Sequence, residues 1–83
     1  MTIELTFYTT DGCHLCEEAV PILQRLLAEA PGVYQVESID IVESEALVQR
    51  YGLRIPVIAK EGDIDGLGWP FDYSAVLNYL TAT

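Results

Sequence analysis

The stretch that decides the fold is Phe7-Tyr8-Thr9-Thr10-Asp11-Gly12-Cys13-His14-Leu15-Cys16-Glu17-Glu18. It holds both cysteines of the 83-residue chain, separated by two residues. The segment Ile3–Tyr8, which leads into it, alternates apolar and polar side chains and predicts a strand. Apolar side chains after it recur with helical spacing. The Cys-x-x-Cys pair therefore lies where a strand turns into a helix, and this context says more about its chemistry than the motif alone.

That placement favours thiol–disulfide chemistry. The attacking species in disulfide exchange is a thiolate, and the first turn of a helix stabilises an anion through its unpaired N–H groups and its dipole. We predict that Cys13, nearest the helix start, is the exposed nucleophile and that Cys16, one turn further on, is the resolving thiol.

Charged neighbours would tune the pKa of Cys13 in opposite directions. A protonated His14 would lower this pKa further, and the simpler alternative is a solvated histidine at a helix start. Carboxylates near a thiol disfavour its anion, and three of them surround the pair: Asp11, Glu17 and Glu18.

Other uses of a cysteine pair fit this chain less well. Two cysteines and His14 supply three ligands, whereas a closed structural zinc site needs four, so zinc would require two chains to share a site. Haem attachment needs a histidine directly after the second cysteine, where this chain has Glu17. Both thiols could instead be buried as small apolar side chains, although Gly12 suggests an open approach to Cys13. We predict no metal site.

Composition narrows the function classes. Apolar residues make up 51% of the chain and charged residues 20%, which is typical of a single globular domain, here residues 1–83. Four basic residues stand against thirteen acidic ones, and a net charge of −9 argues against binding to nucleic acid or anionic membranes. The acidic balance serves solubility and permits attraction of basic protein partners.

The sequence has no apolar run long enough to span a membrane and begins without the basic and apolar regions of a signal peptide. We therefore expect a cytoplasmic protein. In that compartment two cysteines are more often catalytic or redox-sensing than a structural staple.

A helix with one face packed on a sheet is predicted after the first strand. Its apolar stripe consists of Cys16, Ala19, Val20, Leu23, Leu26, Leu27 and Ala30. Pro21 lies inside this helix and predicts a kink, and Pro31-Gly32 ends it.

The remaining chain alternates strands and helices. The predicted elements are a strand at 33–41, a helix at 43–51, a strand at 55–60, an antiparallel strand at 64–67 and a helix at 73–80. The alternation of the strand at 33–41 slips, which allows a bulge or a strand buried on both faces. The expected order is β-α-β-α-β-β-α. It forms an α/β fold with a four-stranded mixed sheet and helices on both faces, and the first two strands pair in parallel.

Three segments carry a resemblance to the thioredoxin-fold superfamily. They are the cysteine stretch at the end of the first strand, Tyr51-Gly52-Leu53-Arg54-Ile55-Pro56-Val57, and Gly66-Leu67-Gly68. Pro21 stands where thioredoxins commonly have a proline. The short length, without an additional strand and helix at the start, resembles glutaredoxins more than thioredoxins, and the likeness covers nearly the whole chain.

The resemblance implies both a thioredoxin-like fold and a site. Pro56 would follow a cis peptide bond and face the cysteines, and the backbone of Ile55 would pair with an extended substrate segment. Leu15 and Asp72 would complete the substrate-binding residues. Taken alone, the residues favour an ordinary strand start at Ile55-Pro56 and an ordinary helix N-cap at Asp72.

The chain departs from the glutaredoxin pattern around the cysteines. His14-Leu15 replaces the usual Pro-Tyr, Thr9-Thr10-Asp11 stands where a basic residue is usual, and Gly66–Asp72 lacks the paired glycines that precede the glutathione-gripping acid. Trp69 and Phe71 would either form a hydrophobic lip beside the cysteines or pack in the core.

We therefore expect a divergent glutaredoxin-like dithiol–disulfide oxidoreductase. It would act as a monomer on protein or small-molecule disulfides, with no bound cofactor and with glutathione as a candidate co-substrate. Two alternatives stay open: a thioredoxin-fold binding module without redox activity, and a metal or iron–sulfur carrier.

Overall fold

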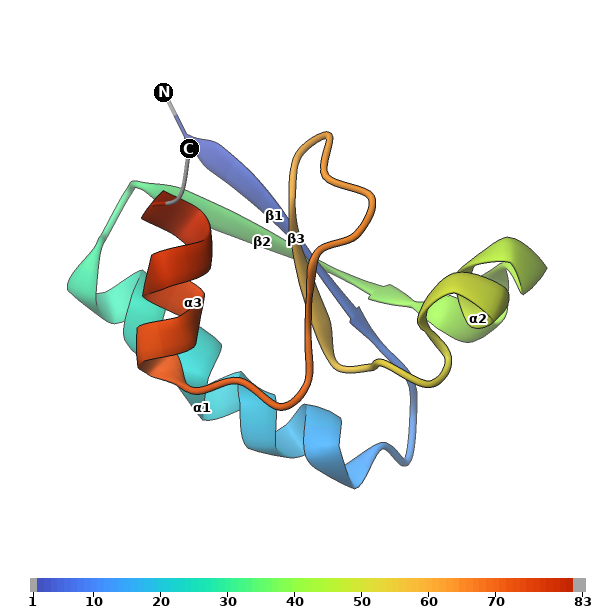
Figure 1. Cartoon of the computed structure of the whole chain (residues 1–83). Coiled ribbons are helices and arrows are strands. Elements are labelled where there is room, and N and C mark those ends of the chain that lie inside the picture. The colour runs from blue at the N-terminus through green and yellow to red at the C-terminus, as the bar shows by residue number, and fades with distance from the viewer. Residues whose placement is uncertain (1, 82–83) are drawn as a thin grey trace.

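The computed structural model describes residues 2–81, and Figure 1 shows how their helices and strands are arranged. In chain order the elements are β1 (Ile3–Thr9), α1 (His14–Glu29), β2 (Tyr34–Asp40), a 3₁₀ turn η1 (Ile41–Glu43), α2 (Glu45–Tyr51), β3 (Val57–Lys60), β4 (Leu67–Gly68) and α3 (Tyr73–Thr81). This order confirms the predicted β-α-β-α-β-β-α arrangement.

The strands form one mixed sheet in the order β2-β1-β3-β4. β1 and β2 pair in parallel, from Ile3 opposite Tyr34 to Thr9 opposite Asp40. β3 runs antiparallel to β1, and β4 runs antiparallel to β3. The fold is therefore thioredoxin-like, with the first strand in the interior of the sheet and its carboxyl end leading directly to the cysteines (Figure 1).

Helices cover both faces of the sheet. Successive β1 side chains point to opposite faces, so they pack into two different hydrophobic clusters. On one face Leu5 and Phe7 pack with α1 and α3. On the other face Tyr8 packs against a cluster that contains Tyr51 of α2, and their rings stack with centroids 4.2 Å apart. Each fully buried aliphatic or aromatic side chain in such clusters contributes roughly 1.5–3 kcal/mol.

The predicted apolar stripe of α1 was too wide. Cys16, Ala19, Leu23 and Leu26 are buried, as expected. Val20 and Leu27 are 40% and 37% exposed, so these two predictions were wrong. The residues that are buried recur every three or four positions and form a narrow line, and Val20 and Leu27 lie just outside it.

Several details of the later elements differ from the sequence prediction, and β3 begins at Val57 rather than at residue 55. The pairing of β2 with β1 is continuous, so β2 has no bulge, and its residues are exposed or partly buried, so the strand is not buried on both faces either. The helix expected at 43–51 begins at Glu45 as α2, and the separate turn η1 precedes it, where Asp40 Oδ1 accepts the N–H of Val42 at 3.1 Å. The fourth strand is Leu67–Gly68 rather than 64–67, because its partners on β3 are Ile58 and Val57.

Tyr79 ties α3 to the turn after β3. Its hydroxyl donates to Asp63 Oδ2 at 2.5 Å and accepts the backbone N–H of Lys60 at 2.9 Å. Partial burial, followed by the hydrogen bond to Asp63, raises the pKa of Tyr79 to about 12. One side chain therefore joins two segments that lie far apart in the sequence.

We expect Tyr79→Phe to lower the free energy of unfolding by about 1–3 kcal/mol, because the Lys60 N–H loses its acceptor and Asp63 loses a donor. The wild-type protein should also lose stability as the pH rises from about 10 to about 12. In that range the unfolded tyrosine releases its proton while the folded one retains it. Urea unfolding at pH 7 and pH 11 measures both effects. An equal alkaline loss in wild type and Tyr79→Phe would contradict this role.

Candidate functional site

A tight turn delivers the chain from β1 to the cysteines. The N–H of Cys13 donates to the carbonyl of Thr10 at 3.4 Å, and Gly12 in the third position of this turn has φ +76°. A positive φ at that position is the requirement of a type II turn and favours glycine. The turn places Cys13 at the N-cap of α1.

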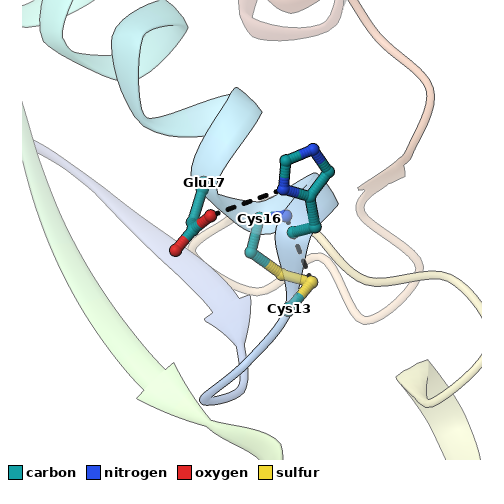
Figure 2. A network of polar contacts seen from close by, with 4 residues as sticks. Cys13, Cys16 and Glu17 are labelled. Atoms are coloured by element: carbon teal, nitrogen blue, oxygen red, sulfur yellow. Dashed lines mark hydrogen bonds and ion pairs between the residues drawn. A yellow bond between two sulfur atoms is a disulfide. The ribbon is translucent and has the colours of Figure 1, made fainter.

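The two cysteines are joined by a disulfide (Figure 2), and they differ in burial. Their Cα atoms are 5.2 Å apart. Cys16 is only 4% exposed and belongs to the main core cluster, whereas Cys13 is partly buried at the edge of that cluster. The order of exposure is the one expected from the sequence, with Cys13 outermost.

The start of α1 interacts directly with the outer sulfur. Cys13 Sγ accepts the backbone N–H of Cys16 at 3.1 Å, drawn as a dashed line in Figure 2. This N–H is one of the four that a helix N-terminus leaves without an intrahelical partner. A donor so placed, together with the positive end of the helix dipole, stabilises negative charge on that sulfur.

The two residues between the cysteines face solvent. The side chain of His14 is 84% exposed, and its Nδ1 lies 3.6 Å from Glu17 Oε2. The imidazole thus lies beside a carboxylate at the surface, and tuning of Cys13 by His14 stays a prediction. Leu15 is 43% exposed and offers an apolar side chain beside the pair.

The peptide bond between Ile55 and Pro56 is cis, as the resemblance implied. Because Tyr8 stands opposite Val57 in the antiparallel pairing of β1 and β3, Pro56 lies at the edge of the sheet where β1 ends and the turn to Cys13 begins. The Ile55 N–H donates to the carbonyl of Tyr51 at 3.0 Å. A substrate segment that pairs with the backbone of Ile55 would therefore donate to the Ile55 carbonyl oxygen.

The sequence did not predict that the chain after β4 makes hydrogen bonds to the loop that contains Pro56. The N–H of Trp69 lies 3.0 Å from the carbonyl of Pro56 and 3.2 Å from that of Arg54. The Trp69–Pro70 bond is also cis, which nothing in the sequence had suggested. Local patterns carry no signal for hydrogen bonds between segments more than ten residues apart.

Trp69 and Phe71 pack against the main core. Phe71 is buried, Trp69 is partly buried against the same cluster, and their rings meet edge to face with centroids 5.0 Å apart. Of the two expectations for these residues, core packing is the one that the structure supports.

Asp72 caps α3, as the simpler expectation had it. Its Oδ1 accepts the N–H of Ala75 at 2.8 Å, which satisfies one donor at the start of this helix. Its carboxylate is exposed, and contact with glutathione stays a prediction.

A shallow hollow of about 180 Å³ lies beside the disulfide. It is lined by both cysteines and by Phe7, Thr9, Thr10, Asp11, Gly12, Glu17 and Val20. Two of these side chains are carboxylates and none is basic. Within residues 2–81, no three His, Cys, Asp or Glu side chains gather closely enough to hold a metal ion.

None of the helices described is long and apolar enough to cross a membrane.

Known proteins are similar to this chain over most of its length. The protein XcR50 from X. campestris, solved by X-ray diffraction, is 40% identical to this chain with a TM-score of 0.70, and the match covers 95% of this chain and 97% of that one. The solution structure of Ne2328 from Nitrosomonas europaea is 29% identical with a TM-score of 0.75, over 93% and 89% of the two chains. A thioredoxin from Methanocaldococcus jannaschii is 26% identical over 69 residues, which is 82% of this chain and 81% of that protein.

The family model of the Glutaredoxin-like domain (DUF836) matches residues 4–81, nearly the whole chain. The match includes the strand, the cysteine pair, the cis-proline segment and the last helix. The chain belongs to the Glutaredoxin-like domain family.

Proposed function

We propose that this protein is a dithiol–disulfide oxidoreductase with Cys13 as nucleophile and Cys16 as resolving thiol. The observation that carries the proposal is the position of Cys13 Sγ at the N-terminus of α1, where it accepts the Cys16 N–H, with Cys16 buried beneath it. A thiolate at Cys13 would be both stabilised and reachable, and the second sulfur lies close enough to form the Cys13–Cys16 disulfide.

The reaction proceeds by two exchanges. The Cys13 thiolate attacks one sulfur of the substrate disulfide, a Cys13–substrate bond forms, and the departing thiolate takes a proton from water. Cys16 then loses its proton and attacks Cys13 Sγ. This closes the Cys13–Cys16 disulfide and releases the second substrate thiol, so two electrons pass from protein to substrate. A dithiol, or two molecules of a monothiol, returns the protein to its reduced form.

Substrate contacts would come from the cis-proline loop and the first turn of α1. The carbonyl of Ile55 can accept an N–H of an extended polypeptide, as in pairing with a strand. Leu15 offers apolar contact on the solvent side of the pair. Asp72 stands at the start of α3 and would contact a substrate only through the carboxylate oxygens that the helix cap leaves accessible.

The pH dependence of Cys13 alkylation tests this proposal. In reduced Cys16→Ser protein Cys13 is the one thiol, and we expect its apparent pKa to lie below the free value of ~8.5. His14→Gln in the same background separates the contribution of the imidazole from that of the helix. Cys13→Ser is the matched control, in which the buried Cys16 should react slowly. A pKa of Cys13 at or above the free value would count against a thiolate held ready at the helix start.

A further inference from the structure

Each of the four basic side chains of the chain lies near an aromatic ring, and none of them lines the hollow beside the cysteines. Arg25 pairs with Glu29 at 2.6 Å and lies over the Tyr73 ring, and Lys60 lies 4.9 Å from the centroid of the Tyr79 ring. The guanidiniums of Arg50 and Arg54 both lie 6.0 Å from the Tyr51 centroid. Arg54 also approaches the carbonyl of Gly66, which directs it toward β4.

The hollow beside Cys13 is lined by carboxylates and by no basic side chain, and the exposed His14 lies next to Glu17. Asp11 and Glu17 line the hollow beside the disulfide, and Glu18 follows on α1. All three side chains are exposed, so their charges reach an approaching molecule. Leu15 and Val20 are exposed among them. A partner at this surface therefore meets carboxylates and apolar side chains, without a basic side chain in the lining of the hollow.

We propose that the substrates of this site are polypeptide disulfides flanked by lysine or arginine, and that anionic disulfides, oxidised glutathione among them, react poorly. The inference rests on the proposed function and names its substrate class. Clustered charge of one sign raises the association rate of an oppositely charged partner by roughly 10- to 1,000-fold at low salt, and like charges at an interface disfavour the wrong partner. The carboxylates act here as specificity determinants, while Cys13 remains the reacting atom.

Matched peptides test the charge preference directly. The protein is first reduced with dithiothreitol, which is then removed. It is mixed with three disulfide-linked peptides that differ only in the residues beside the cysteines, which are Lys, Gln or Glu. The rate of exchange is followed by acid quench and mass spectrometry. We expect the Lys peptide to react at least about tenfold faster than the Glu peptide at low salt, with the ratio falling in 0.5 M salt as screening shortens the range of the charges.

Two triple variants assign the preference to the surface around Cys13. Asp11→Asn with Glu17→Gln and Glu18→Gln removes the carboxylates there. Glu4→Gln with Glu37→Gln and Glu61→Gln removes three carboxylates that line a different hollow, across β1 and β2. Both variants lower the net negative charge equally, and melting curves check that both fold. Because the ratio of Lys to Glu peptide rates is compared, changes in the reactivity of Cys13 itself cancel.

The outcomes separate the two proposals. A ratio that falls to about two- or threefold in the first variant, and stays within about twofold of wild type in the second, supports the inference. Equal ratios in all three proteins, or an equal fall in both variants, overturn it while leaving disulfide exchange intact. Absence of exchange with every peptide overturns the proposed function, and the substrate class with it.

Discussion

Cys13→Ser should abolish disulfide exchange, with a loss of roughly a thousandfold or more in the rate of substrate reduction. A serine hydroxyl at this position is not ionised near neutral pH, so it cannot replace a thiolate as the attacking group. The substitution exchanges one sulfur atom for oxygen on a partly buried residue, so the fold should persist. The loss is measured by the peptide exchange assay described above.

Cys16→Ser is the matched control for that result, since it removes the other sulfur by the same atomic change. Cys13 can still attack, but nothing resolves the intermediate from within the chain. Mixed disulfides between Cys13 and the substrate should therefore accumulate and appear as a mass increase that dithiothreitol reverses. If Cys13→Ser kept full activity while Cys16→Ser lost the first exchange step, the two roles would be reversed.

The parts of the fold that the sequence predicts well are those set by local rules. The alternation in β1 and the helical spacing after Cys16 place the cysteine pair between a strand and a helix, and the structure confirms this to within a residue or two. The N-cap at Asp72 follows from the same kind of rule. The cis bond before Pro56 came from the family resemblance alone, because a cis X-Pro bond is a minority conformation that composition does not reveal.

The parts that the sequence did not predict depend on contacts between elements that are distant in the chain. Helical periodicity identified the buried face of α1 but not its width, so Val20 and Leu27 were placed in the core. The exposure of Val20 matters to the site, because it lines the hollow beside the disulfide. Similarly, the position of β4 is set by hydrogen bonds to β3 and by the contact of Trp69 with the Pro56 loop, which no local pattern encodes.

Gly66→Ala is expected to lower the free energy of unfolding by about 2–5 kcal/mol, a large share of the stability of a small domain. Gly66 has φ +64°, a conformation that alanine adopts at a cost. A Cβ there would also lie 2.8 Å from Val57 Cγ1 and 2.9 Å from the carbonyl oxygen of Ile58. Both neighbours are fully buried residues of β3, so neither can move without disturbing the core.

Gly62→Ala separates the two causes, because Gly62 has φ +85° but no atom within 4 Å of the Cβ position. It should lose only the conformational part, about 1 kcal/mol, so the difference between the two variants measures the steric conflict with β3. Urea unfolding at 25 °C gives both values. Equal losses would mean that β3 yields to the added methyl group. A larger loss at Gly66 would show that close packing of the β3–β4 connection against β3 helps to hold the segment that leads to Trp69 and the cis-proline loop.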